Sequence, residues 1–341
     1  MHSSEVISLR SEAFEVIFDL ISPSRYSQII KYLGDICHLL VIRKEIGGLI
    51  AILHQELKVS NFTPICNSKK MPEGNVVLQT VDWLISLFDG PLTSYHLIGF
   101  ERYSKPNAKT IRFPLVKPAD LQPALDGKLL DIYCKGKWYF MEFEHDISIV
   151  AHHGLKGKWT REVELNTQFG FTFAKLTEAG DIIEQSELKF YFSNILNGDF
   201  QILKTRAALQ EKLDSLAPGF IGRWLVTREQ WFAGFAKFTP KKRLRDILMD
   251  QTAVVSGLGN FYLAEIFYVM KLDPRAKLGD VDQNALFDAA RDIMIGHYTK
   301  QLEKVIYNRK VCPAGFKIQL MEVGSRTAHW VPEVQTIGRP V

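Results

Sequence analysis

Hydrophobic and polar positions alternate along this chain in two successive patterns. Over residues 76–88 the apolar set Leu78, Val81, Ile85 and Phe88 recurs at helical spacing, which predicts one amphipathic helix before a cap at Asp89-Gly90. Strand-like segments follow at 129–134 and 138–143, and residues 147–152 alternate apolar with polar side chains. These three segments predict a β-meander, and a second strand group is expected at 188–192 and 200–203.

After Lys204 the spacing of apolar residues becomes helical. Helices are expected at 206–213, 227–235, 244–249, 262–270 and 283–305. Strands first and helices afterwards are typical of an α+β protein with two domains, joined near residues 204–217. The last thirty residues, rich in Gly, Pro, Val and Arg, predict a short separate appendage.

Residues 1–70 carry apolar clusters broken by single charges. They predict two or three short amphipathic helices, with a break at Ser22-Pro23-Ser24 between the first two. Acidic and basic residues are nearly balanced in this segment, so it is not a basic arm for gripping DNA. A packing extension, or one absent from the mature protein, is the favoured interpretation.

Composition narrows the class of protein only moderately. A chain of 341 residues with 46% hydrophobic content has enough material for two compact domains and an appendage. A net charge of +4 permits a polyanionic partner without requiring one. Four scattered cysteines and no leader at the start indicate a reduced, intracellular protein, nuclear in a eukaryote and otherwise cytoplasmic. Charges interrupt the longest apolar stretch, so we expect a soluble protein with no membrane span.

Three motifs occur in one order along the chain. Met71-Pro72-Glu73-Gly74 precedes the first helix, the segment 249–262 contains Gly257-Leu258-Gly259-Asn260, and Gly324-Ser325-Arg326-Thr327 lies near the end. Together they resemble the formamidopyrimidine-DNA glycosylase and endonuclease VIII-like family, over residues 71 to about 337. The middle motif resembles that family's helix-two-turn-helix and is the most specific of the three.

The resemblance implies a DNA-repair activity carried by Pro72 and Glu73. A secondary amine can attack the anomeric carbon of a damaged nucleoside and become an iminium ion, which then permits elimination of the strand phosphates. By the resemblance Pro72 is the nucleophile, and Glu73 is the general acid and base. Taken without the other motifs, the two residues would be an ordinary helix-start proline and a first-turn glutamate.

The position of Pro72 raises a chemical difficulty. As written, its nitrogen is a tertiary amide whose lone pair is delocalised into the carbonyl, so it cannot form an iminium ion. We therefore expect the active species to begin at Pro72, by initiation at Met71 and methionine removal or by proteolysis. The rival interpretation is a catalytically silent DNA binder with an added N-terminal segment.

Further residues match the family's DNA contacts. Lys137, in the turn after Gly136, resembles its hairpin lysine, although an ordinary exposed turn lysine is the alternative. Asn260 follows a glycine turn that allows close backbone approach to phosphate, and a helix N-cap is its alternative. Arg245 is a candidate for a further phosphate contact, against a solvated arginine on a helix face.

Leu155 lies where the family places a residue that fills the gap left by an everted base. A core leucine is the equally weighted alternative. Arg326 is expected to reach phosphate rather than to be a solvated turn arginine. Neighbouring His152 and His153 point to opposite faces of a strand, so a shared metal ion is not expected.

The terminal appendage departs from the family pattern. Most relatives hold this hairpin with four zinc ligands, but this segment keeps only Cys312 and has valines where a second cysteine pair would stand. One thiolate cannot complete a tetrahedral zinc site. The sequence predicts a zincless hairpin held by Trp330, Val331 and Val334, with no cofactor.

The full expectation is an α+β protein in three parts after the extension 1–70. They are a β-sandwich at 71–204, a helix-two-turn-helix domain at 205–308 and a zincless β-hairpin at 309–341. We expect a monomer that binds damaged DNA in the cleft between its domains and acts as glycosylase and abasic-site lyase by β,δ-elimination. Asn75, Val76 and the loop 194–199 depart from the guanine-oriented branch, which favours oxidised pyrimidines or ring-opened bases.

Two other functions remain open from the sequence. A noncatalytic damaged-DNA-binding protein would bind lesions without nicking, whichever residue comes first. A structural nucleic-acid protein that uses only the helical turn would keep its DNA-dependent activity when Lys137 is replaced by alanine.

Overall fold

The computed structural model describes residues 73–103, 121–125, 127–154, 157–193 and 198–340. The chain divides into two compact units, Met1–Thr63 and Pro64–Val341, and every described residue belongs to the second. The helices expected in residues 1–70, together with Pro72 and Leu155, therefore lie outside the described residues. No helix of the described ranges is long and apolar enough to cross a membrane.

Helix α4 (Gly74–Ser86) opens the described chain and begins two residues before the position expected from the sequence. Its buried face is formed by Val77, Val81 and Leu84, spaced four and three residues apart. The expected face included Leu78 and Ile85, but Leu78 is only partly buried and Ile85 is exposed. The buried face is therefore rotated by about one residue, and α4 packs against β2, β3 and α10.

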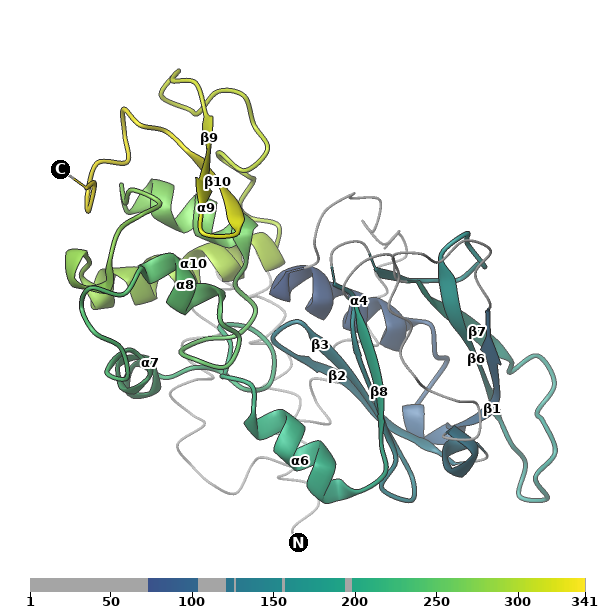
Figure 1. Cartoon of the computed structure of the whole chain (residues 1–341). Coiled ribbons are helices and arrows are strands. Elements are labelled where there is room, and N and C mark those ends of the chain that lie inside the picture. Colours follow the sequence, from purple (N-terminus) through teal and green to yellow (C-terminus); the bar gives the residue numbers. More distant parts are fainter. Residues whose placement is uncertain (1–72, 104–120, 126, 155–156, 194–197, 341) are drawn as a thin grey trace, which may run out of the picture. The chain divides into compact units, whose positions relative to one another are not determined.

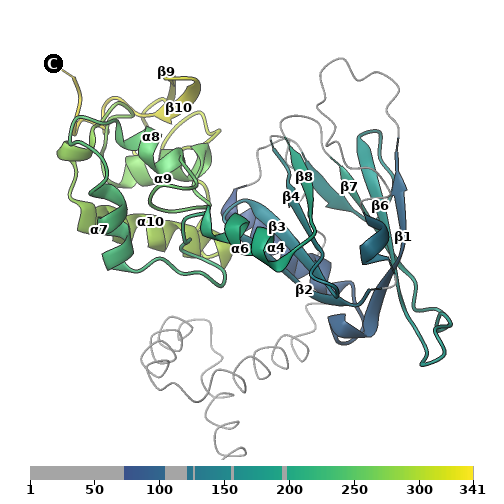
Figure 2. The same ribbon diagram turned by 60° about the horizontal axis from the view of Figure 1, so that its bottom comes forward.

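Two antiparallel four-stranded sheets follow α4, in the orders β1-β6-β7-β5 and β2-β3-β4-β8. Figure 2 shows them as two layers. The first contains β1 (Tyr95–Arg102), β5 (Lys158–Thr160), β6 (Thr167–Lys175) and β7 (Leu188–Ser193). The second contains β2 (Leu129–Lys135), β3 (Trp138–Phe143), β4 (Ser148–His152) and β8 (Asp199–Leu203). Single 3-10 turns lie at Leu92–Ser94 and Gln122–Ala124.

Phenylalanine rings on alternate positions of β6 join the two sheets. Phe169, Phe171 and Phe173 are fully buried and point to one side of the strand. Phe169 meets Phe200 of the other sheet with ring centroids 4.5 Å apart, and Phe173 stacks on Phe143 at 6.2 Å. One shared aromatic core between the sheets makes this region a β-sandwich.

The predicted meander is confirmed as β2-β3-β4, and the two strands of the second group are confirmed as β7 and β8. The segments at 188–192 and 200–203 lie in different sheets, since β7 pairs with β5 and β6 whereas β8 pairs with β4. Strands β1, β5 and β6 were not expected. Strands β7 and β8 therefore belong to different layers, which local alternation of side chains does not encode.

Five helices follow the sandwich. They are α6 (Arg206–Asp214), α7 (Arg228–Phe235), α8 (Leu244–Met249), α9 (Asn260–Val269) and α10 (Gln283–Tyr298), with a 3-10 turn at Leu278–Asp280. In Figure 1 α7 to α10 lie together, whereas α6 lies beside the strands and packs on the β2-β3-β4 sheet. Helices α7 to α10 share one buried core that includes Trp231, Leu263 and Met294. The α+β class is confirmed by this succession of strands and helices.

Helix α10 ends at Tyr298, and the expected continuation to Val305 is wrong. Lys300 adopts a φ of 59°, a left-handed conformation that stops the helix. The Leu302 amide then donates to the Gly296 carbonyl at 3.0 Å, so the chain folds back on the last helical turn. Residues 299–307 therefore form a non-helical segment with turns, and its apolar residues satisfy tertiary contacts and not a helical face.

A terminal hairpin completes the described chain. Strands β9 (Gln319–Val323) and β10 (Arg326–Trp330) pair antiparallel, with Arg326 opposite Val323. Beneath the hairpin a small apolar cluster joins it to α9 and contains Ala264, Ile306, Cys312, Ile318 and Val331. The hairpin is thus fixed to the same helix whose first turn forms the candidate site.

Candidate active site

The start of α4 lies against the turn that precedes α9. The Gly74 amide donates to the Gly257 carbonyl at 2.9 Å. A Cβ atom built on Gly74 would lie 2.9 Å from the Gly257 Cα, so only glycine permits this approach of the two backbones. The contact sets Glu73, one residue earlier, directly in front of α9.

The Glu73 carboxylate caps the N-terminus of α9. Its Oε1 accepts the Phe261 amide at 2.8 Å and its Oε2 accepts the Tyr262 amide at 3.2 Å. The first amides of a helix have no partner within the helix and carry a partial positive charge, which favours an anion. Only 2% of Glu73 is exposed, so this carboxyl is removed from water and held by a second element of the protein.

Burial and hydrogen bonding act in opposite directions on Glu73. Loss of water raises the pKa of this carboxyl above its usual range, and that effect is the largest. The Lys137 charge, the two α9 amides and the Lys304 charge each lower the pKa and oppose the burial. A carboxyl whose pKa is raised by burial, beside cations that oppose the rise, is suited to act as a proton donor and acceptor.

Lys137 reaches the same point from the β2–β3 turn. A Cβ atom built on Gly259 would lie 2.6 Å from Glu73 Oε1 and 2.7 Å from Lys137 Nζ, so both groups converge on Gly259. Burial lowers the pKa of Lys137, the Glu73 charge raises it, and the Arg326 charge lowers it further. Lys137 is only 7% exposed, which contradicts the alternative of an ordinary exposed turn lysine.

Asn260 and Arg245 are joined by a hydrogen bond. Arg245 Nη2 donates to Asn260 Oδ1 at 2.6 Å and to the Thr327 carbonyl of the hairpin at 3.3 Å. Because Arg245 occupies the amide oxygen, the Asn260 NH₂ group remains as a donor, the polarity that a phosphate accepts. The N-cap of α9 is Gly259, so the N-cap alternative for Asn260 is wrong.

Arg245 itself is buried beneath the site. It is 2% exposed, and burial lowers the pKa of its guanidinium. The alternative of a solvated arginine on a helix face is therefore wrong. Its hydrogen bonds place it as the link between α8, the first residue of α9 and the hairpin.

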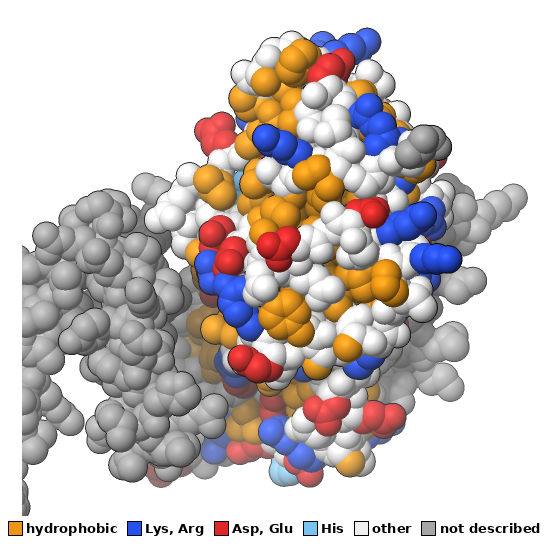
Figure 3. Space-filling view, turned by 90° about the vertical axis from the view of Figure 1, so that its left-hand side faces the viewer, with side chains coloured by type: hydrophobic (Ala, Val, Ile, Leu, Met, Phe, Trp, Pro, Cys, Tyr) orange, Lys and Arg blue, Asp and Glu red, His pale blue; other side chains and the backbone are white. Residues whose placement is uncertain are grey.

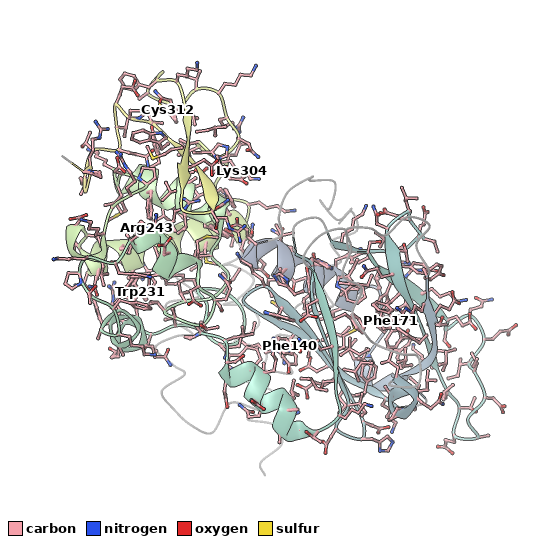
Figure 4. The ribbon with its side chains drawn as sticks, viewed as in Figure 1. Phe140, Phe171, Trp231, Arg243, Lys304 and Cys312 are labelled. Atoms are coloured by element: carbon pink, nitrogen blue, oxygen red, sulfur yellow. The ribbon has the colours of Figure 1, made fainter. Side chains whose placement is uncertain are left out.

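Arg326 is exposed at the start of β10. Its charge lowers the pKa of both Lys137 and Arg245, so three cations from three elements lie near the α9 N-terminus. Arg243, labelled in Figure 4, approaches the hairpin turn, since a Cβ atom built on Gly324 would lie 3.1 Å from its Nη2. The structure thus brings Glu73, Lys137, Asn260, Arg245 and Arg326 together.

Apolar side chains and two arginines surround the base of the hairpin. Val331 is fully buried in the cluster with Cys312, and Val334 packs against that cluster. The Trp330 ring instead has two guanidinium groups near it, 5.9 Å away for Arg275 and 5.6 Å away for Arg339. Within the described ranges, no three His, Cys, Asp or Glu side chains come close enough to hold a metal ion.

Two residues near Glu73 were not expected from the sequence. Lys304 and Tyr307 lie in the segment after α10, and the Lys304 charge lowers the pKa of Glu73. Burial raises the pKa of the Tyr307 hydroxyl, and the nearby Glu73 charge raises it further. The Tyr307 ring lies 5.7 Å from Phe261 and 4.6 Å from His329. The helix expected over 283–305 concealed Lys304, because it placed this residue on a helical face, and Tyr307 lies just beyond it without a motif.

One face of the helices and the hairpin is drawn in Figure 3. Lysine and arginine side chains are interspersed there with acidic and hydrophobic ones, and neither sign of charge gathers into a single field. This face therefore shows no single field of positive charge.

The sequences of known proteins resemble this chain moderately. A formamidopyrimidine-DNA glycosylase from Ligilactobacillus salivarius is 25% identical over 235 residues, which cover 60% of this chain and 79% of that protein. One from Bartonella tribocorum is 28% identical over 185 residues, covering 50% of this chain and 59% of that protein. This chain thus spans less than two thirds of the length of the second relative. No family model matches the chain.

Solved structures match the fold over most of their own length. A Lactococcus lactis formamidopyrimidine-DNA glycosylase in complex with DNA containing a formamidopyrimidine lesion has a TM-score of 0.57 at 19% identity. The match covers 72% of this chain and 94% of that one. A complex of the L. lactis protein with tetrahydrofuran-containing DNA and an inhibitor gives 0.61 at 19% identity, over 78% of this chain and 100% of that one. At this identity the likeness establishes the fold.

Proposed function

Because the chain belongs to the formamidopyrimidine-DNA glycosylase and endonuclease VIII-like family, we propose that it is a DNA-repair enzyme acting on damaged DNA. The proposed reaction is excision of an oxidised base followed by cleavage of the strand at the resulting abasic site. The observation that carries the proposal is the convergence of the Glu73 carboxyl and the Lys137 ammonium on Gly259, at the start of α9.

The proposed mechanism requires Pro72 to be the first residue. Its secondary amine attacks the anomeric carbon, and the damaged base leaves as the sugar ring opens, which generates an iminium ion. Glu73 donates a proton to the opening sugar and afterwards accepts the proton released at the adjacent carbon, which allows β,δ-elimination of the two phosphates. Its raised pKa supports both the protonated and the ionised role.

The proposed DNA contacts lie on three elements near Glu73. Asn260 donates its amide NH₂ to a backbone phosphate, and Arg326 supplies a second, charge-assisted contact from the hairpin. Lys137 holds the phosphate next to the lesion. Arg245 fixes the Asn260 amide and the hairpin, and Leu155 fills the space left by the everted base.

The domain limits, the absence of zinc, the oligomeric state and the preferred lesion are also proposed. The domain limits remain 71–204, 205–308 and 309–341, the hairpin carries no zinc, and the protein acts as a monomer without a cofactor. Oxidised pyrimidines are the favoured lesions, because residues 75, 76 and 194–199 depart from the guanine-oriented branch. Burial of Val331 beside Cys312 and packing of Val334 against that cluster support the zincless hairpin.

Borohydride trapping tests the mechanism directly. Protein produced with Pro72 as its first residue is mixed with duplex DNA that contains thymine glycol or an abasic site, and borohydride is added. A covalent complex is expected, and Pro72→Gly is expected to abolish it. No trapped complex with abasic DNA from protein that begins at Pro72 would remove the enzymatic proposal.

One observation favours a second candidate function. Pro72 is internal in the sequence as written, and its amide nitrogen cannot form the iminium ion. A noncatalytic damaged-DNA-binding protein would bind lesion-containing duplexes tightly and leave them intact, whether it begins at Met1 or at Pro72. N-terminal mass spectrometry of protein from its native cell identifies which form exists.

A further inference from the structure

The segment after α10 is fixed to the middle of α9 by one buried carboxylate. Glu265 is 2% exposed and accepts the amides of Val305 at 2.8 Å, Ile306 at 3.1 Å and Tyr307 at 2.8 Å. Three charge-assisted hydrogen bonds to consecutive amides fix both the position and the direction of this segment. The residue just before it, Lys304, is thereby given a defined place.

That place is above the first turn of α9. Lys304 Nζ lies 4.8 Å from the centroid of the Phe261 ring, within the range of a cation–π contact. The amide of the same Phe261 donates to Glu73 Oε1. Phe261 therefore contacts the lysine through its ring and the carboxylate through its backbone. In Figure 4 the label of Lys304 lies beside the hairpin.

We propose that Lys304 is a positioning residue for the Glu73 carboxyl, and that Glu265 is the anchor that keeps it above Phe261. The inference rests on the proposed function of Glu73 as acid and base. Lys304 acts through Glu73: its charge sets how readily that carboxyl ionises, and its contact with Phe261 fixes the amide that Glu73 accepts.

Five titratable groups from different elements surround Glu73. They are Lys137 from the β2–β3 turn, Arg245 from α8, Tyr262 from α9, and Lys304 with Tyr307 from the segment after α10. Of these, Lys137 and Lys304 are the two cations that lower the pKa of Glu73 against the larger effect of burial. Removing the Lys304 charge should raise the pKa of Glu73 further. The limb of the pH–rate profile that is caused by ionisation of Glu73 should then move to higher pH, whether the carboxyl acts as acid or as base.

The kinetic test compares two substitutions of Lys304. Single-turnover excision by protein beginning at Pro72 is followed from pH 5 to pH 9 for wild type, Lys304→Met and Lys304→Arg. We expect Lys304→Met to move the Glu73 limb to higher pH, and Lys304→Arg to restore the wild-type limb. Lys310→Met, which removes an exposed lysine from the neighbouring segment, should leave the profile unchanged. An unshifted profile for folded Lys304→Met, with or without a changed KM, would overturn the proposal.

A second measurement does not depend on activity. Carboxyl ¹³C chemical shifts of DNA-free protein are titrated with pH, and the Glu73 signal is identified by its loss in Glu73→Gln. Lys304→Met should raise the measured pKa of Glu73, and Glu265→Gln should raise it in the same direction by releasing the segment. If wild type is inactive but these shifts occur, the proposed function fails and the positioning role stands. If Glu73 titrates identically in wild type and Lys304→Met, the positioning role fails.

Discussion

Two buried glutamates are associated with helix α9: Glu73 binds its first amides, and Glu265 is one of its own residues. They differ in the charged groups near their hydrogen bonds. Glu73 reaches the start of the helix from outside and accepts two of its amides, with the Lys137 and Lys304 charges nearby. Glu265 leaves the middle of the same helix and accepts three amides of the non-helical segment after α10. Equal burial therefore gives one carboxyl that is suited to proton transfer and another that serves as an anchor.

Removing the acidity of Glu73 should give the largest effect on activity. Glu73→Gln keeps an oxygen for the α9 amides but has no ionisable proton, so excision should fall by about 10²- to 10⁴-fold. Single-turnover excision of a lesion-containing duplex measures the loss. Glu303→Gln is the matched control, because Glu303 is 92% exposed and lies outside the site. If Glu73→Gln keeps activity within threefold of wild type, Glu73 is not the acid and base, and the proposed difference in role between Glu73 and Glu265 is wrong.

Neutralising Glu265 should give the largest effect on stability. Glu265→Gln replaces a charged acceptor of three amides by a neutral one, and we expect a loss of about 3 kcal/mol in the free energy of unfolding. Urea denaturation followed by tryptophan fluorescence measures this loss, again with Glu303→Gln as control. If Glu73→Gln destabilises the protein more than Glu265→Gln does, then Glu73 and not Glu265 is the principal anchor.

The dependence of stability on pH should separate Glu73 from an ordinary capping carboxylate. Because the folded pKa of Glu73 is raised, the folded protein binds its proton more tightly than the unfolded chain does. The corresponding contribution to stability is present below the unfolded pKa, and it is lost as pH rises through the folded pKa. Glu73→Gln mimics the protonated carboxyl, so its stability should decline less than that of wild type over this window. Denaturation midpoints measured at a series of pH values test this, and parallel curves would refute it.

A third buried carboxylate, that of Asp273, differs from Glu73 and Glu265 because its charged partners are exposed to solvent. Asp273 is fully buried, but Arg275 and Arg339, which pair with it, are each about two-fifths exposed. Solvent screens such cations, so Arg339→Gln should lower the free energy of unfolding by only about 0.5 kcal/mol. Thermal unfolding with Arg309→Gln as an exposed control measures the difference. A cost as large as that of Glu265→Gln would mean that contact of Arg339 with Trp330, and not its charge, supports the C-terminal segment.

The sequence predicted the residues of the site better than the elements that carry them. Glu73, Lys137, Asn260 and Arg326 were named from motifs, and the structure brings all four to the start of α9. Lys304 and Glu265 were missed because each depends on contacts between distant segments. Apolar spacing continued past Tyr298, and only the fold-back of Leu302 onto Gly296 shows that the helix ends there.

Strands β1 and β6 were missed for a related reason. Each contains a glycine, Gly99 and Gly170, that interrupts the alternation of side chains. Pairing with the neighbouring strand holds both glycines in the sheet, because Gly99 lies opposite Thr172 and Gly170 lies opposite Glu101. Strand formation there is decided by the partner strand and by the phenylalanine core, not by the intrinsic preference of the segment.

The contact between Glu73 and Phe261 joins residues 188 positions apart in the sequence. Neither the sandwich alone nor the helices alone contains a complete acid–base centre, because one contributes the carboxyl and the other the amides that hold it. In a translating or partly unfolded chain that lacks this long-range contact, the candidate site is consequently not assembled. Two separately expressed fragments that regained function on mixing would report reassociation of the whole molecule.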